Sequence, residues 1–198
     1  IYERSSGTTT ELQGIFPIFS ADGQLIGTSL WDEDKSYIYE RSSGTTTELQ
    51  GRSTSFSADG QLIGTFSLNE GKSYIYKLSS GTTTELQGIS PRFSADGQLI
   101  ITYLENQDKS YIYERSSGTT TELQGRSPRF SADGQLIGTF SMREDKSYIY
   151  ERSSDATGLQ GRLATVGNGL QLNCEAIASP TSTAQGSVST LPVLVRVL

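Results

Sequence analysis

The segment FSADGQLIG, at residues 56–64, decides the fold because it returns along the chain at a fixed interval. It is followed by SYIY at residues 73–76 and by SSGTTTELQG at residues 79–88, and these three blocks recur together every 37 residues. Self-similarity at a period of this size is typical of repeat architectures, in which each unit packs on its neighbours. We therefore expect one continuous array and not several independent domains.

Each unit contains four runs that favour an extended backbone. In the quoted unit the first run ends at Phe56, and Asp59-Gly60 supplies the turn of a tight hairpin into Gln61–Ser67. Ser73–Lys77 places bulky residues on both faces of a third strand, which predicts that both faces are covered. Thr82–Leu86 then forms the fourth strand. Helical repeats have similar periods, but the period-two alternation and the many Gly, Ser, Thr and Tyr residues favour strands.

Four-stranded antiparallel units of about 40 residues that stack around an axis are the blades of a β-propeller. The sequence therefore predicts an all-β propeller built from 37-residue four-stranded blades. Two stretches are the most informative for comparison with known blades: SPRFSADGQLIGTFS (residues 127–141) and YIYERSSGTTTEL (residues 111–123).

These stretches resemble the WD-repeat-like propeller blade of the TolB type. FSADG stands where that family has Phe-Ser-Pro-Asp-Gly, YIYE where it has its third-strand motif, and SSGTTTEL where it has a Thr-Gly turn into the fourth strand. The Gly-His and Trp-Asp pairs of the stricter WD repeat are absent, and with them the hydrogen-bond relay built on those residues. The resemblance covers residues 1–161 and implies a propeller fold and a periplasmic or extracellular location. It implies no particular activity, because propellers host unrelated functions.

The chain divides into the repeats and a divergent end. Residues 162–198 abandon the repeat. Either they complete a fifth blade with the amino-terminal piece, or the array belongs to a larger ring and they form a linker or another module. The repeats occupy residues 1–161, as a partial unit at 1–14 and full units at 15–51, 52–88, 89–125 and 126–161.

The differences among the full units cluster in two segments. SADGQLI and KSYIY are identical in all four, whereas the entry to the first strand and the link between the second and third strands vary. Both variable segments lie at the same end of an antiparallel meander. They form either a recognition surface, as loops on one face of repeat proteins do, or loops that nothing constrains. The predicted surface consists of Phe16, Trp31, Asp32, Glu33, Asp34, Arg52, Asn69, Glu70, Glu105, Asn106, Gln107, Arg126, Arg143 and Glu144.

Composition removes most catalytic chemistry from consideration. The chain has no His and a single Cys, Cys174, so the commonest general base, the Ser-His-Asp triad and thiolate zinc sites are all missing. The acidic run at residues 32–34 lacks the spacing of a Ca²⁺ loop, and we interpret it as a solvated loop. We therefore expect no catalytic residue, no cofactor and no metal. Four aspartates recur every 37 residues and suit either a ring of carboxylates or, as we favour, tight turns before Gly: Asp22, Asp59, Asp96 and Asp133.

The balance of 16 basic and 22 acidic residues, with no basic run, argues against nucleic acid as a partner. The longest apolar stretch, Leu191–Leu198, is too short to span a membrane, so no membrane insertion is expected.

These observations predict a non-catalytic scaffold that recognises a peptide, protein or glycan through the loops of one face. The alternative is an accessory propeller domain of a larger secreted or periplasmic hydrolase, which a flanking α/β domain with a Gly-x-Ser-x-Gly elbow would indicate. Trp31, the only Trp, fits a sugar-stacking platform, an interface anchor or packing on the next blade. Tyr37 and Tyr39 recur in every unit and are expected to be packing residues.

Overall fold

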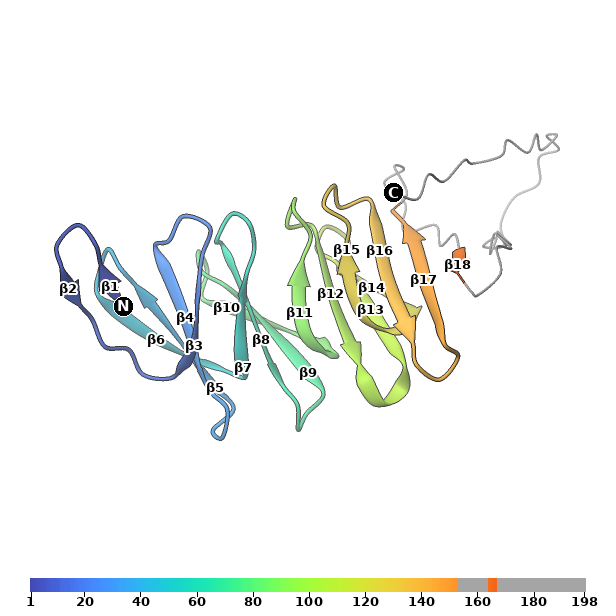
Figure 1. The fold of residues 1–198 in the computed structure, drawn as a ribbon, viewed down its shortest axis with the longest axis horizontal. Helices are drawn as coiled ribbons and strands as arrows, with labels where there is room; N and C mark the ends of the chain where they lie inside the picture. The colour runs from blue at the N-terminus through green and yellow to red at the C-terminus, as the bar shows by residue number, and fades with distance from the viewer. Residues whose placement is uncertain (153–163, 167–198) are drawn as a thin grey trace.

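The computed structural model describes residues 1–152 and 164–166, and this part of the chain is built from strands and one 3₁₀ turn. The all-β propeller class is confirmed, because four four-stranded antiparallel sheets stand side by side (Figure 1). A short two-stranded sheet of β1 (Tyr2–Glu3) and β2 (Thr8–Thr9) precedes them. No helix in the described ranges has the length and hydropathy needed to cross a membrane.

The strands follow the predicted units. The first three four-stranded sheets lie within residues 15–51, 52–88 and 89–125. They consist of β3 (Ile15–Phe19), β4 (Leu25–Leu30), β5 (Lys35–Glu40) and β6 (Thr45–Gln50); β7 (Arg52–Phe56), β8 (Leu62–Ser67), β9 (Lys72–Lys77) and β10 (Thr82–Gln87); and β11 (Ile89–Phe93), β12 (Leu99–Leu104), β13 (Lys109–Glu114) and β14 (Thr119–Gln124). The 3₁₀ turn η1 (Glu105–Gln107) links β12 to β13.

The fourth sheet contains β15 (Arg126–Phe130), β16 (Leu136–Ser141), β17 (Lys146–Glu151) and β18 (Ala164–Val166). Its outermost strand, β18, pairs with β17 and begins beyond Gly161, the predicted end of the fourth unit. Of residues 162–198, for which completion of a fifth blade was one of two alternatives, the structure describes only β18, which belongs to the fourth sheet; the rest lie outside the described residues. The two terminal sheets lie at opposite ends of the long axis of the molecule (Figure 1).

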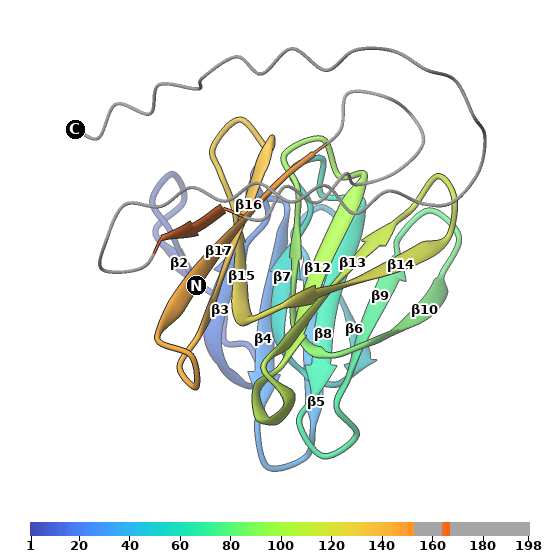
Figure 2. The same ribbon diagram turned by 90° about the vertical axis from the view of Figure 1, so that its right-hand side faces the viewer.

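Each sheet is a meander whose strands follow one another in chain order. The first strand of each sheet packs on the second strand of the sheet before it, as β7 does on β4 and β11 on β8. Figure 2 shows the sheets fanning outward, with β10 and β14 on one side, β17 and β18 on the other, and β3, β7 and β15 between them. The first strands therefore lie near the axis of a propeller arc and the fourth strands at its rim.

The core consists of one apolar seam repeated between neighbouring sheets. Between the second and third sheets, Leu62, Ile75 and Leu86 pack against Ile100 and Phe93. Equivalent residues fill the other two seams. The prediction of packing tyrosines is confirmed for the buried set Tyr37, Tyr74, Tyr111 and Tyr148, whereas Tyr39, Tyr76 and Tyr113 are half-buried. Burial of apolar side chains contributes about 25 cal/mol per Å², so each seam stabilises the two sheets that form it.

The hairpin between the first and second strands confirms the turn interpretation of the recurrent aspartates. In the second sheet the Ser57 hydroxyl donates to Asp59 at 2.5 Å, and the backbone amide of Gln61 donates to the same carboxylate oxygen at 3.0 Å. The amide of Leu62 donates back to the Ser57 hydroxyl at 2.9 Å. The carboxylate thus caps its own turn, as it does in the other three sheets.

The link from one sheet to the next is fixed by hydrogen bonds and by glycine. The Ser36 hydroxyl donates to the Gly51 carbonyl at 2.8 Å, and the Thr65 hydroxyl donates to the Gln50 carbonyl at 2.5 Å. Gly51 has φ +84°, and a Cβ there would lie 2.9 Å from the Thr65 hydroxyl oxygen. Only glycine therefore fits this crossing from the rim back to the axis without strain.

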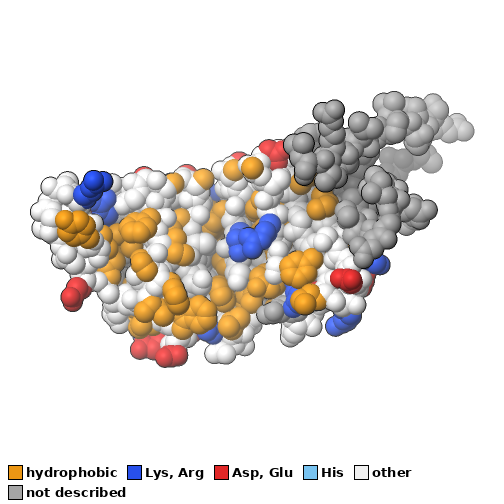
Figure 3. All heavy atoms as spheres, viewed as in Figure 1, with side chains coloured by type: hydrophobic (Ala, Val, Ile, Leu, Met, Phe, Trp, Pro, Cys, Tyr) orange, Lys and Arg blue, Asp and Glu red, His pale blue; other side chains and the backbone are white. Residues whose placement is uncertain are grey.

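The first and fourth sheets expose residues that the two interior sheets bury. Leu62 and Leu99 are 3% exposed, whereas Leu136, at the same position of the fourth unit, is 40% exposed. The face of β3, with Ile15, Ile18 and Phe19, is exposed too. Figure 3 shows apolar side chains spread over the face that looks toward the viewer in Figure 1.

Replacing the equivalent leucines of two units, Leu62 and Leu136, distinguishes the stabilisation due to packing between sheets from the stabilisation within one strand. We expect Leu62→Ala to lower the free energy of unfolding by about 2–4 kcal/mol because it opens a cavity in a closed seam. Leu136→Ala should cost about 1 kcal/mol or less, because water already reaches the side chain. Urea unfolding monitored by circular dichroism measures both free energies. Equal losses in the two variants would contradict the assignment of Leu62 to a closed seam.

Thr54 is a weak point within the first seam. It is buried, its hydroxyl has no hydrogen-bond partner among the described residues, and units one, three and four carry Pro at this position. Thr54→Pro should stabilise the protein by about 1–2 kcal/mol, since it removes an unsatisfied hydroxyl and restricts the unfolded chain. Thr65→Val, which deletes a hydroxyl that is bonded, should destabilise it. A lower melting temperature for Thr54→Pro would contradict the structural equivalence of position 54 with Pro17, Pro91 and Pro128.

Stability should also fall in acid through Asp96. Partial burial raises the pKa of this carboxyl, but hydrogen bonds from Ser94, the Gln98 amide and Arg152 outweigh it and lower the pKa to about 2. Arg152 lies 2.6 Å from Asp96 across the seam between the third and fourth sheets. The stabilisation is present above the unfolded pKa near 4 and is lost as the pH falls toward 2.

Asp96→Asn should therefore lower the melting temperature at pH 7 by about 2–4 °C, which corresponds to about 1 kcal/mol once solvent screening of this half-exposed pair is allowed for. At pH 2, where about half of the Asp96 carboxyls are protonated, the difference between the variant and the parent should shrink to a small fraction of its value at pH 7. Asp22→Asn is the control, because its neighbouring unit has Leu78 where Arg152 would stand. An Asp96→Asn deficit that persists unchanged at pH 2 would contradict the linkage.

Candidate functional site

The variable loops between second and third strands gather along one edge of the arc. This edge is the lower one in Figure 1, and the tight hairpins between first and second strands lie along the upper edge. Antiparallel pairing produces this separation, because successive connections alternate between the two ends of a meander. The predicted surface residues therefore lie at one end of the blades, although they divide among separate clusters.

A cleft of about 910 Å³ opens at this edge between the second and third sheets. Its volume suits a small-molecule ligand. Five residues of the predicted surface line it: Asn69, Glu70, Asn106, Gln107 and Arg126. The sequence did not single out the other lining residues: Leu68, Gly71, Lys72, Glu85, Leu86, Gln87, Ile89 and Leu104.

The cleft coincides with a departure from the repeat at two positions. Between the first and second sheets, Asp34 and Arg52 form an ion pair at 3.0 Å, with the side chains 25% and 12% exposed. The equivalent positions between the second and third sheets hold Gly71 and Ile89, which are shorter and uncharged. The described array therefore lacks an Asp–Arg pair at this seam, and Gly71 and Ile89 both line the cleft. The replacement of Asp and Arg by Gly71 and Ile89 is the sequence signal that could have located the cleft.

The backbone of this loop tolerates either residue type. Gly71 has φ +63°, and Asp34, Asp108 and Asp145 adopt φ between +54° and +56° at the equivalent positions. The left-handed region is accessible to Gly and, at small cost, to Asp. Gly at position 71 thus keeps the loop conformation while removing the side chain that would project there.

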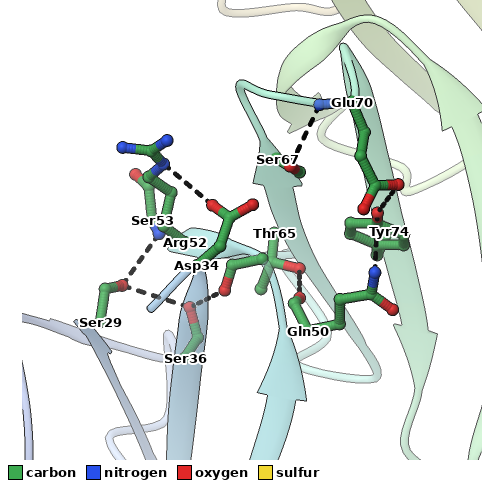
Figure 4. Close-up of polar contacts among 11 residues, drawn as sticks. Ser29, Asp34, Ser36, Gln50, Arg52, Ser53, Thr65, Ser67, Glu70 and Tyr74 are labelled. Atoms are coloured by element: carbon green, nitrogen blue, oxygen red, sulfur yellow. Dashed lines mark hydrogen bonds and ion pairs between the residues drawn. The ribbon is translucent and has the colours of Figure 1, made fainter. Parts of the chain in front are cut away.

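Glu70 is held by a hydrogen-bonded chain that crosses the first seam. Figure 4 shows Gln50, Tyr74 and Glu70 in succession: the Gln50 amide donates to the Tyr74 hydroxyl at 2.9 Å, and that hydroxyl donates to Glu70 Oε2 at 2.7 Å. Burial, followed by the hydrogen bond to Glu70, raises the pKa of Tyr74 well above its usual range. Tyr74 therefore remains a hydrogen-bond donor. Within the described residues the other Glu70 oxygen makes no hydrogen bond.

Lys72 and Glu85 provide a second pair of charges in the cleft. The Lys72 ammonium lies 2.8 Å from Glu85 Oε2. The hydrogen bond with Glu85 raises the pKa of Lys72, so the ammonium stays charged over the whole neutral range. The lining therefore combines carboxylates, an ammonium group and side-chain amides with apolar walls from Leu68 and Leu104.

A second cluster of predicted residues lies at the seam between the first and second sheets. The rings of Phe16 and Trp31 are 5.9 Å apart and tilted by 58°, and the Arg52 guanidinium carbon lies 5.4 Å from the Trp31 ring centre. The structure thus brings Phe16, Trp31, Asp34 and Arg52 together, away from the cleft lining.

The remaining predicted residues do not join either cluster. Asp32 and Glu33 are exposed, and Glu33 lies 3.5 Å from Lys35. Glu144 accepts hydrogen bonds from Gln124 and Tyr148 in the last seam, and Arg143 is exposed. Glu105 belongs to η1, but its side chain lies outside the described part of the structure.

The arrangement offers acid–base chemistry through carboxylates. Among residues 1–152 and 164–166, no three His, Cys, Asp or Glu side chains converge as a metal site would require. The chain has no His, so a general base in the cleft has to be a carboxylate. Glu70 and Glu85 are the carboxylates of the lining.

Comparisons with solved structures support the propeller class. The structure is similar to periplasmic gluconolactonase from Pseudomonas aeruginosa, with TM-score 0.53, 18% identity, and 83% of this chain and 56% of that chain covered. It is similar to a candidate 6-phosphogluconolactonase from Bacteroides fragilis, with TM-score 0.52, 16% identity, and 80% and 55% covered. It is also similar to Kuenenia stuttgartiensis hydrazine synthase, with TM-score 0.53, 14% identity, and 77% and 49% covered.

The chain spans about half the length of these structural neighbours. No protein-family model matches the sequence, and no curated protein matches it either. At this level of identity the likeness establishes the fold.

The neighbours correct one prediction from the sequence. We expected a non-catalytic scaffold and no enzyme activity, yet propellers of this shape include proteins named as lactonases. The prediction was wrong in its reasoning, because the absence of His and paired Cys was taken to exclude catalysis. Glu70 of the β8–β9 loop and Glu85 of β10, which line the same cleft, were not considered together, although carboxylates are sufficient for general base chemistry.

Proposed function

We propose that the chain is part of a hydrolytic β-propeller whose cleft between the second and third sheets binds and opens a small sugar-derived lactone. The observation that carries this proposal is the cleft itself, which combines Glu70, Glu85 and Lys72 in a volume of about 910 Å³. Support for the substrate class comes from the lactonases among the structural neighbours. The side-chain amides of Asn69 and Asn106 suit recognition of sugar hydroxyls, because each offers both a donor and an acceptor.

The reaction needs a base and a group that stabilises negative charge. Glu70 accepts a proton from water, and the resulting hydroxide forms a bond to the lactone carbonyl carbon. Lys72, kept protonated by Glu85, stabilises the oxyanion of the tetrahedral intermediate. The ring C–O bond then breaks, and Glu70 returns its proton to the leaving alkoxide. The product is the open-chain hydroxy acid.

The units themselves belong, in this proposal, to the WD-repeat-like TolB type. FSADG, YIYE and SSGTTTEL support that finer assignment. The protein partners considered from the sequence have no comparable support at the cleft, because its volume and polar lining favour a small ligand.

Substitution of the proposed base tests the chemistry. Glu70→Gln should reduce the rate of D-glucono-1,5-lactone opening at least about 100-fold, because the amide cannot accept the proton. The rate above spontaneous hydrolysis is measured by acid release in a pH-stat. Glu33→Gln is the matched control, since Glu33 occupies the same unit position outside the cleft. Absence of any acceleration by the parent chain, or a fully active Glu70→Gln, would refute the proposed reaction.

A second variant tests the cleft without touching its charged groups. The double substitution Gly71→Asp with Ile89→Arg introduces the equivalent of the Asp34–Arg52 ion pair, which fills the space at the loop edge between the first and second sheets. It should preserve the melting temperature, because Asp34 and Arg52 already occupy this geometry, and it should abolish hydrolysis by filling the cleft. A folded double variant with parental activity would place the reaction elsewhere.

A further inference from the structure

Two aromatic residues that occur in a single unit meet in space. Phe16 stands where the other three units carry Ser, and Trp31 stands where the second and fourth units carry Leu and Met. They come from β3 and from the β4–β5 loop, and their ring centres are 5.9 Å apart. Both remain accessible, with Phe16 62% and Trp31 45% exposed. The pair is therefore an aromatic surface and not a closed core.

Phe16 occupies a backbone position that disfavours a large side chain. Its φ is +54°, and the serines at the equivalent positions have φ between +51° and +59°. A left-handed conformation costs about 1–2 kcal/mol for a residue with a Cβ, and bulky residues are rare there. The fold itself is built with Ser at this position in three units. The ring of Phe16 is thus not needed to form the strand. Its contact with Trp31 distinguishes the first unit from the other three.

Polar groups border the aromatic surface on one side. Arg52 donates from Nε to Asp34 Oδ1 at 3.0 Å, and its guanidinium lies over the Trp31 ring. Figure 4 shows the two terminal nitrogens of Arg52 directed away from Asp34. Among the described residues, neither these nitrogens nor the second Asp34 oxygen makes a hydrogen bond. Donors and an acceptor are therefore held in fixed positions beside exposed rings.

We infer that Phe16, Trp31, Asp34 and Arg52 form a binding platform for a neutral pyranose ring. A pyranose whose hydroxyls are equatorial presents flat C–H faces that pack on aromatic rings, and hydroxyls at its edge that pair with carboxylate and guanidinium groups. The exposed acidic residues Asp32 and Glu33, together with the net charge of -6, disfavour an acidic sugar. The platform is separate from the cleft, and its binding requires no hydrolysis.

Trp31 is the only Trp in the chain, so its fluorescence reports on the platform alone. Titration with cellotetraose, a neutral β-linked glucose oligomer, should change the Trp31 emission in a saturable manner. Phe16→Ser keeps the reporter and installs the residue found in the other units, and it should weaken binding at least tenfold. Trp31→Leu, followed by calorimetry, should abolish the binding heat.

Met142→Ala is the matched control, because Met142 occupies the Trp31 position of the fourth unit and is exposed. It should bind cellotetraose as the parent does. The platform would be refuted if Phe16→Ser bound cellotetraose as tightly as the parent. It would also be refuted if cellotetraose at tens of millimolar did not change the Trp31 emission of the parent. Both results are independent of lactone hydrolysis, since cellotetraose contains no lactone.

Discussion

The apolar seam between neighbouring sheets is the interaction on which the rest of the structure depends. Leu62, Ile75 and Leu86 of one sheet pack against Ile100 and Phe93 of the next, and the same positions pack at every other seam of the described array. A four-stranded sheet with apolar residues on both faces is stable in water only when both faces are covered. Each unit therefore requires its neighbours, which fixes the order and the orientation of the sheets.

Because the seam is so regular, function has to arise where the units differ. Two seams at the loop edge illustrate this. Asp34 and Arg52 fill the space between the first and second sheets, whereas Gly71 and Ile89 leave a cleft between the second and third. The hydrogen bonds from Gln50 to Tyr74 and from Tyr74 to Glu70 couple the two places, so the carboxylate in the cleft is oriented from the adjacent seam.

Much of the fold could be predicted from the sequence because the signals were local and repeated. The Asp59-Gly60 turn, the alternation in Ser73–Lys77 and the 37-residue period each specify strands and connections within one unit, and the structure agrees. The cleft could not be predicted in the same way. Its lining combines residues as far apart as Leu68 and Arg126, and the loop residues that vary among the units include both cleft and non-cleft members. The exclusion of catalysis failed because it rested on missing residue types and not on the spatial grouping of those present.

The most direct test of this account is a crystal structure of the chain with D-gluconolactam, an unreactive amide analogue of the lactone. We expect the ring of the analogue between the β8–β9 loop and η1, with the Glu70 carboxylate near the carbonyl carbon and Lys72 near the carbonyl oxygen. An analogue bound at the opposite edge of the sheets, or sheets that do not share the repeated seam, would contradict it.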